Sequence, residues 1–268
     1  MSTDGSLALR DPRYDAVRRA TYVALDVPTW LQAEALVERF GAAVDGYKVG
    51  LELYFGDGPA ALSGLRRLGK RVFLDVKLHD IPNTVAGALA AIARYGVEMV
   101  NVHASGGPAM LTAAREALDA AAAESDGPRP LLVAVTVLTS LGAADLERLG
   151  WGRGASDAQA LVARWAALAA SCGLDGVVAS ALEVAQLRRQ SPPGFEIVVP
   201  GTRPSGAPRH DQVRSLTPGE AMAAGATRLV LGRAVTRAKD PLLALERIWE
   251  EMESVAPPAA SGMPKDDG

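Results

Sequence analysis

Eight short apolar runs, rich in β-branched residues, alternate with longer helical stretches, and this alternation constrains the fold more than any other feature. The runs are YVALDV (22–27), GYKVGL (46–51), RVFLDVK (71–77), MVNVHA (99–104), LLVAVTVLT (131–139), GVVAS (176–180), EIVVPGT (196–202) and RLVLG (228–232). Strands that are apolar along their whole length are buried on both faces, as in a parallel sheet covered by helices. Eight strand–helix units in about 250 residues predict an α/β fold, a single (β/α)8 TIM barrel. A doubly wound open sheet is the alternative, but the count of eight favours a closed barrel.

No low-complexity linker divides the 268 residues, so we expect one barrel domain over residues 21–255 that carries the catalysis. Residues 1–20 precede the first apolar run and form an N-terminal extension, to which we assign no role. Residues 256–268, with the sequence APPAASGMPKDDG, are expected to form a disordered tail.

The composition excludes several classes of protein. The formal net charge is −3, so no overall field attracts nucleic acid or an anionic membrane, and a phosphorylated ligand needs a local cationic pocket. The single cysteine excludes a disulfide framework and a cysteine-based zinc site, and it fits a reducing compartment. The N-terminus lacks a secretory apolar segment, and the longest apolar run, LLVAVTVL (131–138), is too short to span a bilayer. We therefore expect a cytoplasmic protein that binds neither nucleic acid nor membrane.

Charged side chains gather where the apolar runs end, which in a TIM barrel is the face that carries the chemistry. A buried charge without a partner is costly, and one structural ion pair would account for two such residues but not four. The four are Asp26, Lys48, Asp75 and Lys77. Two uncharged residues at similar places have simpler interpretations: Ser180 suits a helix cap, and Asn101 suits a satisfied core amide.

The densest block of charge is DVKLHDIPNT (75–84). Asp75 and Lys77 are two residues apart on a predicted strand, so their side chains point to the same side. Asp80 lies beyond the strand in a loop, and the proline that follows suits the first turn of a helix. The simplest arrangement alternates in sign, in the order Lys48, Asp75, Lys77, Asp80, so that each charge lies beside an opposite one. A protonated lysine fixed beside a carboxylate suits the formation and quenching of a carbanion better than an imine mechanism.

Two stretches after the seventh and eighth runs have the composition of a phosphate site. They are VVPGTRPSG (198–206) and LVLGRAVT (229–236), and loops at these places in TIM barrels commonly bind phosphate. Gly232 permits a close approach to the backbone, and Arg233 supplies a fork of hydrogen-bond donors. The polar stretch TRPSGAPRHDQ (202–212), rich in proline and glycine, suits a mobile lid.

These segments together resemble the orotidine 5′-phosphate decarboxylase family, most closely its bacterial class. The resemblance runs in order over about residues 20–250, and the D-x-K-x-x-D-I-P-N-T block is its most specific part. The matching segments are ALD (24–26), KVG (48–50), FLDVKLHDIPNTV (73–85), NVHASGG (101–107), VTVLTS (135–140), CGLDGVV (172–178), PGTRP (200–204), DQ (211–212) and LGRAVT (231–236).

The resemblance implies decarboxylation of orotidine 5′-monophosphate to uridine 5′-monophosphate, the last step of de novo pyrimidine nucleotide biosynthesis, without a metal or an organic cofactor. It implies that Lys77 protonates a carbanion at C6, that Asp75 crowds the departing carboxylate, and that Lys48 and Asp80 complete the charge array. It also implies a homodimer with shared active sites, in which Asp80 and Thr84 reach into the partner's site.

Substrate contacts are implied by the same resemblance. Asp26 and Lys48 would hold the ribose hydroxyls, and Thr139 would contact the pyrimidine ring. The residues implied for the phosphate are Gln212, Gly232 and Arg233, with Arg203 in the closing loop.

Two alternatives remain open. A keto-sugar phosphate decarboxylase or hexulose phosphate synthase would share the D-x-K-x-x-D core but would use a divalent metal, with Asp75, His79 and Asp80 as candidate ligands. Lys77 between these residues, and the IPNT sequence after them, count against it. A barrel that only binds a nucleotide would not need an acid opposite an anionic substrate, so Asp75 separates that class. His79 and His103 are expected to be hydrogen-bonded scaffold residues.

Overall fold

The computed structural model describes residues 9–125, 127–152, 155–204 and 216–255. The predicted tail (256–268), the first eight residues of the predicted extension and most of the predicted lid, Gln212 included, lie outside the described residues.

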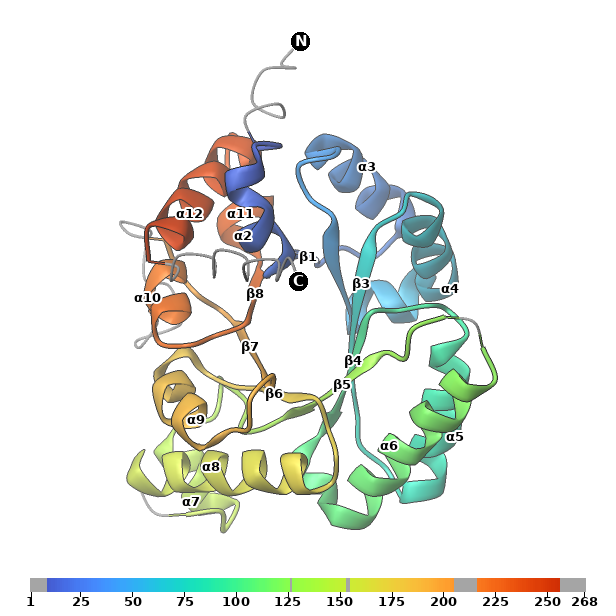
Figure 1. Ribbon diagram of the computed structural model, residues 1–268, viewed down its shortest axis with the longest axis vertical. Helices are drawn as coiled ribbons and strands as arrows, with labels where there is room; N and C mark the ends of the chain where they lie inside the picture. The colour runs from blue at the N-terminus through green and yellow to red at the C-terminus, as the bar shows by residue number, and fades with distance from the viewer. Residues whose placement is uncertain (1–8, 126, 153–154, 205–215, 256–268) are drawn as a thin grey trace, which may run out of the picture.

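Eight parallel strands follow one another around a closed barrel, and the last strand pairs with the first (Figure 1). The strands are β1 (Thr21–Leu25), β2 (Gly46–Gly50), β3 (Arg71–Leu78), β4 (Met99–His103), β5 (Leu131–Val135), β6 (Gly176–Val178), β7 (Glu196–Pro200) and β8 (Arg228–Leu231). Each predicted run supplies one strand, so the prediction of a TIM barrel is confirmed. The fifth run, expected as strand through residue 139, leaves the sheet at Val135.

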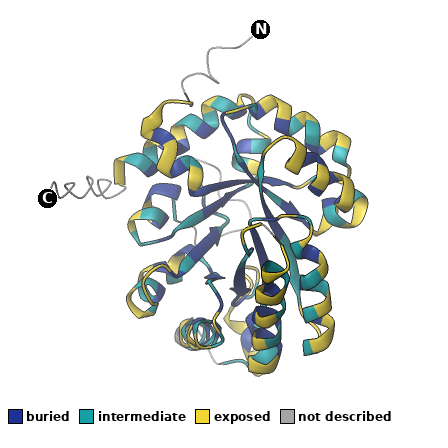
Figure 2. Ribbon diagram, turned by 45° about the vertical axis from the view of Figure 1, so that its right-hand side comes forward, coloured by how far each residue is buried: buried dark blue, intermediate teal, exposed yellow. Residues whose placement is uncertain are grey.

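Helices connect the strands and surround the barrel. They are α3 (Trp30–Phe40), α4 (Leu51–Arg67), α5 (Pro82–Ala93), α6 (Gly107–Ala123), α7 (Ala143–Arg148), α8 (Ala155–Ser171), α9 (Val184–Gln190), α10 (Pro218–Ala223), α11 (Arg233–Thr236) and α12 (Pro241–Val255). Shorter helical segments are η1 (Pro12–Tyr14), α2 (Asp15–Arg19), η2 (Ala104–Gly106) and η3 (Ala181–Glu183). Figure 2 shows buried strands inside and exposed outer faces on the helices. Within the described ranges, no helix has the length and apolar character needed to cross a membrane.

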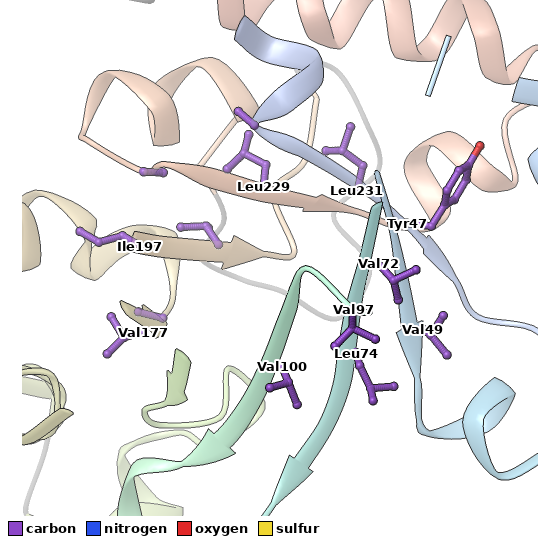
Figure 3. Close-up of a cluster of buried hydrophobic side chains, with 14 of the residues drawn as sticks. Tyr47, Val49, Val72, Leu74, Val97, Val100, Val177, Ile197, Leu229 and Leu231 are labelled. Carbon is purple, nitrogen blue, oxygen red and sulfur yellow. The ribbon is translucent and has the colours of Figure 1, made fainter. Parts of the chain in front are cut away.

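The strand side chains divide between two apolar clusters, because successive residues of a strand point to opposite faces. The outer cluster packs strands against helices, and Figure 3 shows some of its members, among them Val49, Leu74 and Ile197. The inner cluster fills the barrel with Tyr22, Ala24, Phe73, Met99, Val133, Val198 and Val230. The interior is therefore a packed core, as is usual in this fold, and ligand sites belong at the carboxyl ends of the strands.

Ion pairs and a phenol lie at the amino-terminal end of the barrel. The Tyr22 hydroxyl donates to Glu98 Oε2 over 2.6 Å, and Arg71 Nη1 lies 2.7 Å from the same oxygen. Arg71 Nη2 lies 2.9 Å from Asp45 Oδ1. Burial, and then the charge of Glu98, raise the pKa of Tyr22 far above its usual value, so the phenol stays neutral and donates. We assign this network to stability, because chemistry in TIM barrels lies at the opposite end.

The described part of the predicted N-terminal extension packs onto α12. Leu9 and Tyr14 are fully buried, and the Tyr14 ring lies 5.8 Å from the Trp249 ring between centroids. Trp249 Nε1 also donates to Thr21 Oγ1 over 3.1 Å. Residues 9–20 therefore contribute to the apolar core, a role that the sequence did not reveal.

Candidate active site

A cavity of about 220 Å³ lies at the carboxyl ends of the strands. One part of its lining is charged and comes from β2 and β3, namely Lys48, Asp75 and Lys77. The rest is mainly apolar and includes Val137, Val178, Pro200 and Val230, with Thr139 as a polar exception. A small ring with an anionic substituent on one edge fits this division of polarity.

The charged part of the lining is a row of alternating sign. Lys77 Nζ lies 2.5 Å from Asp75 Oδ1, and Lys48 Nζ lies 3.4 Å from Asp75 Oδ2. Lys48 Nζ also lies 3.2 Å from Asp26 Oδ1. The four buried or strand-end charges singled out in the sequence therefore meet, in the order Asp26, Lys48, Asp75, Lys77. The fourth member within this chain is Asp26 at the start of the row, where the sequence had suggested Asp80 at its end.

The Asp75 carboxyl is ionised by its neighbours. Burial alone would raise its pKa, since its side chain is only 14% exposed. The ammonium groups of Lys48 and Lys77, together with hydrogen bonds from Lys77 and Asn101, outweigh burial and hold the pKa of Asp75 below its usual value. Any second carboxylate brought against Asp75 would meet a fixed negative charge.

Gly50 makes room for the Lys48 ammonium group at the end of β2. A Cβ added at Gly50 would lie 2.8 Å from Lys48 Nζ and 3.7 Å from Asp26 Oδ1. A larger residue would push the ammonium group out of the row. In the sequence, the only sign of this requirement is the short KVG segment (48–50).

Strand β3 is irregular where the row forms. Its register against β4 shifts between Leu74 and Leu78, and Lys77 has a φ of 50°, the only positive φ among the described non-glycine residues. Asn101 of β4 accepts the Lys77 backbone N–H over 2.8 Å and donates from Nδ2 to Asp75 Oδ1 over 2.7 Å. Asn101 is thus the satisfied, buried amide that its place in the sequence predicted, but both of its partners belong to the charged row.

Asp80 and Thr84 lie outside this row. Both are exposed, and Ile81, the residue directly before α5, is 66% exposed. Asp80 Oδ1 accepts the Ile81 N–H over 2.7 Å, and no ion pair between Asp80 and a lysine occurs in the part of the chain that the structure describes. Helix α5 begins at the predicted proline, Pro82. The side chains of Asp80 and Thr84 are therefore accessible on the surface of the isolated chain.

The predicted phosphate contacts follow β7 and β8. Gly232 directly follows β8, and a Cβ added to it would meet no described atom within 4 Å, so its backbone is open to a ligand. Arg233, the first residue of α11, is exposed. Arg203 is half-buried after β7, and its N–H donates to the carbonyl of Leu216 over 3.2 Å. Gln212 lies outside the described residues.

His79 and His103 pair with each other, with ring centroids 5.5 Å apart. Neither imidazole makes a hydrogen bond to another described residue, so a role for the two as hydrogen-bonded scaffold residues stays a prediction. Burial, followed by the charges of His79 and Lys77, lowers the pKa of His103, and Asp75 opposes this shift. Over the described ranges, no three His, Cys, Asp or Glu side chains gather in the manner of a metal site.

Comparisons with known proteins extend over the whole barrel. The sequence model of the orotidine 5′-phosphate decarboxylase / HUMPS family matches residues 21–248. The orotidine 5′-phosphate decarboxylase of Moorella thermoacetica is 50% identical over 234 residues, which cover 87% of this chain and 92% of that protein. The one from Alkalilimnicola ehrlichii is 51% identical over 230 residues, or 86% and 94% of the two chains. The crystal structure of orotidine 5′-phosphate decarboxylase from Lactobacillus acidophilus is 35% identical with a TM-score of 0.76, and the match covers 87% and 99% of the two chains.

Proposed function

This chain belongs to the orotidine 5′-phosphate decarboxylase / HUMPS family and is a carbon–carbon lyase, and on that premise we propose how its site works. Relatives at 50% and 51% identity are named as the decarboxylase. The activity is therefore the decarboxylation of orotidine 5′-monophosphate in pyrimidine nucleotide biosynthesis, which leaves uridine 5′-monophosphate as the product.

The observation that carries the proposed mechanism is the ionised Asp75 between two ammonium groups, 2.5 Å from Lys77 Nζ and 3.4 Å from Lys48 Nζ. A substrate carboxylate held beside Asp75 is repelled and leaves as carbon dioxide. The electron pair of the broken bond remains on C6 of the pyrimidine. Lys77 stabilises this carbanion and then donates a proton to C6, and the resulting amine regains a proton from solvent.

The charges alone do not account for the catalysis. One ammonium group at ~4 Å and an effective dielectric constant of about 20 contributes on the order of 4 kcal/mol. Enzymes typically lower barriers by about 8–23 kcal/mol. The remainder must come from binding energy supplied by parts of the substrate that do not react, which hold the carboxylate against Asp75.

We assign that binding energy to the ribose, the ring and the phosphate. Asp26 and Lys48, joined at the edge of the cavity, bind the ribose hydroxyls, and Thr139 of the cavity lining contacts the pyrimidine. The phosphate contacts are assigned to Arg203, Gln212, Gly232 and Arg233. The support for this assignment is the position of the three described residues directly after β7 and β8, where TIM barrels commonly bind phosphate.

The proposed functional unit is a homodimer of cytoplasmic chains with shared active sites, each chain contributing a catalytic domain over residues 21–255. Asp80 and Thr84 of one chain complete the site of the other. What supports this is their exposure on the isolated chain and the absence, among the described residues, of an ion pair between Asp80 and the charged row. A two-fold dimer would place both loops equivalently.

One experiment separates this function from its rivals. Purified protein is incubated with orotidine 5′-monophosphate in excess EDTA, and uridine 5′-monophosphate is quantified. Turnover that is unaffected by EDTA supports the proposed mechanism. Turnover that disappears with EDTA and returns with a divalent cation would favour a metal-dependent sugar-phosphate enzyme of the same family. Tight binding without turnover would identify a nucleotide-binding barrel.

A further inference from the structure

We propose that Asn101 is a positioning residue that sets the geometry of both Lys77 and Asp75. This inference rests on the proposed function of the charged row. Asn101 lies on β4, one strand away from the two charged residues, and it is fully buried. Asn101 does not itself line the cavity and is not exposed to solvent, so it acts through the two lining residues that it holds.

The Asn101 amide makes two hydrogen bonds of opposite kind. Its Oδ1 accepts the Lys77 backbone N–H over 2.8 Å, and its Nδ2 donates to Asp75 Oδ1 over 2.7 Å. A backbone N–H can only donate and an ionised carboxylate can only accept, so these partners fix the orientation of the amide. Because Lys77 Nζ lies 2.5 Å from the same Asp75 oxygen, the contacts close a ring through all three residues.

The backbone at Lys77 needs such a partner. The register between β3 and β4 shifts between Leu74 and Leu78, so regular ladder pairing is interrupted at this point. Lys77 also has a φ of 50°, a left-handed conformation that is unfavourable for residues with a side chain. Strained residues of this kind persist only where the surroundings determine them. The side-chain Oδ1 of Asn101 accepts the hydrogen bond in place of a backbone carbonyl of the neighbouring strand. It thereby stabilises the irregular backbone of β3 at Lys77.

The same amide also fixes the Asp75 carboxylate. Asp75 Oδ1 accepts from both Lys77 Nζ and Asn101 Nδ2, while Oδ2 is left to face Lys48 Nζ at 3.4 Å. Rotation of the carboxylate would break the bond from Asn101. Removing the amide therefore frees two groups at once, the carboxylate that faces the substrate and the backbone that aims the ammonium group.

A buried amide can also stabilise a protein without any bearing on catalysis, and Thr136 provides the matched control for that case. It follows β5, is 2% exposed, and its Oγ1 donates to the carbonyl of Val178 over 2.9 Å. It is thus a comparably buried polar side chain at the same end of the barrel, with no bond to the charged row. Thr136→Val measures the cost of losing a buried hydrogen bond at this depth.

The test compares Asn101→Leu with Thr136→Val. For Asn101→Leu we expect kcat to fall about 10²-fold, because a misplacement of about 1 Å has that effect on reacting groups. KM should change by less than about threefold, since the phosphate and ribose contacts are untouched. Thr136→Val should lower the melting temperature but keep kcat within about threefold of wild type. A crystal structure of Asn101→Leu should show Lys77 without its positive φ.

Asn101→Asp gives a second readout, the pH dependence of kcat, which a purely structural role of Asn101 would not change. This variant also provides the test if Asn101→Leu fails to fold. The introduced carboxyl still accepts from the Lys77 N–H, but it donates to Asp75 only when it is protonated. The groups around it are Asp75, Lys77 and Lys48, with His79 and His103 beyond; its neighbour on β5, Val133, is apolar. Because pH also affects the activity of wild type, the kcat of the variant is expressed as a ratio to the kcat of wild type at each pH. That ratio should rise as pH falls.

The outcomes separate this inference from the proposed function. If wild type releases no carbon dioxide, or Lys77→Ala remains active, the proposed function fails. If wild type is active and Lys77→Ala is not, the proposed function holds, and the Asn101 variants alone decide the inference. It is overturned if Asn101→Leu keeps kcat within about threefold of wild type, or if the Asn101→Asp ratio is independent of pH.

Discussion

Lys77 Nζ lies 2.5 Å from Asp75 Oδ1 even though the strand that carries both residues loses its regular pairing between Leu74 and Leu78. The contact therefore does not arise from simple alternation of side chains along a strand. It requires an irregularity in the backbone of β3, which Asn101 of the neighbouring strand stabilises. Irregular pairing and unfavourable backbone conformations of this kind are expected at functional sites.

The strain at Lys77 predicts an unusual order of stability among its variants. Glycine tolerates a positive φ and alanine does not, so Lys77→Gly should be more stable than Lys77→Ala by about 1 kcal/mol. Urea denaturation gives the two free energies of unfolding. Lys48 on the regular strand β2 is the control, and there the glycine variant should be less stable than the alanine variant by about 0.5–1 kcal/mol. Glycine variants that are the less stable at both positions would show that Lys77 is not strained.

Arg233→Ala should weaken use of the phosphorylated substrate. Loss of charge-assisted hydrogen bonds to the phosphate should weaken stabilisation of the transition state by about 3 kcal/mol, which lowers kcat/KM roughly 10²-fold. Arg237, also exposed and at the other end of α11, is the control, and Arg237→Ala should leave kcat/KM nearly unchanged. Inorganic phosphite should partly activate wild type toward a substrate that lacks the phosphate, and activate Arg233→Ala less. Equal activation of both proteins would remove Arg233 from the phosphate site.

A shared site predicts complementation between two inactive variants. When Lys77→Ala and Asp80→Ala are co-expressed, about half of the dimers are mixed. Each mixed dimer has one doubly damaged site and one intact site, so roughly a quarter of all sites should be active.

Co-expression of Lys77→Ala with Lys48→Ala provides the control for that experiment. Both residues belong to the same row in one chain, so every site in this mixture keeps a lesion and no activity should return. If the Lys77 and Asp80 mixture is also no more active than its parents, Asp80 does not serve the partner's site.

Glu183 should make the free energy of unfolding depend on pH. Burial raises its pKa to about 7 from 4.5, although a hydrogen bond from the Ser180 N–H opposes the shift. Because the pKa is raised in the folded state, the folded protein binds this proton more tightly than the unfolded chain does. The resulting contribution to the free energy of unfolding is fully present below pH 4.5 and is lost as pH rises through about 7. Glu183→Gln keeps the capping acceptor and should exceed wild type in stability at high pH by about 1–3 kcal/mol. The two should be equal in acid below the unfolded value.

Glu220 is the matched control for Glu183. Glu220 makes the same capping bond to the N–H of Thr217, over 2.8 Å, but is exposed at α10. Denaturation curves for Glu183→Gln and Glu220→Gln are compared at several pH values. A Glu183→Gln curve that follows wild type at every pH would show that burial of this carboxyl has no energetic consequence.

The sequence predicts the barrel well because its signals are local. Each strand is a short apolar run, and Asp26, Lys48, Asp75 and Lys77 stand at the ends of such runs, where neighbouring parallel strands bring them together. The departure of the fifth run from the sheet at Val135 has no local signal, because residues 136–139 remain partly apolar. Beyond the strand, Val137 and Thr139 line the cavity.

The break in β3 is also invisible in the sequence. It depends on the hydrogen bond that the Lys77 N–H donates to Asn101 Oδ1, and Asn101 is 24 residues further along the chain from Lys77. An asparagine in an apolar run indicates a satisfied polar group but does not identify its partners. Likewise, Asp26 lies 22 residues before Lys48, and spacing along the chain does not reveal that Asp26 begins the charged row.

The release of labelled carbon dioxide from carboxyl-labelled orotidine 5′-monophosphate, by wild type and by Lys77→Ala, tests the central claim most directly. Lys77 is expected to act as the proton donor to C6. General acid catalysis typically contributes roughly 10²–10⁴-fold, so loss of Lys77 should lower kcat by at least about that factor. Binding of uridine 5′-monophosphate, measured by calorimetry on the same samples, should remain close to that of wild type. A Lys77→Ala protein that retains more than about a tenth of the wild-type kcat would contradict the account.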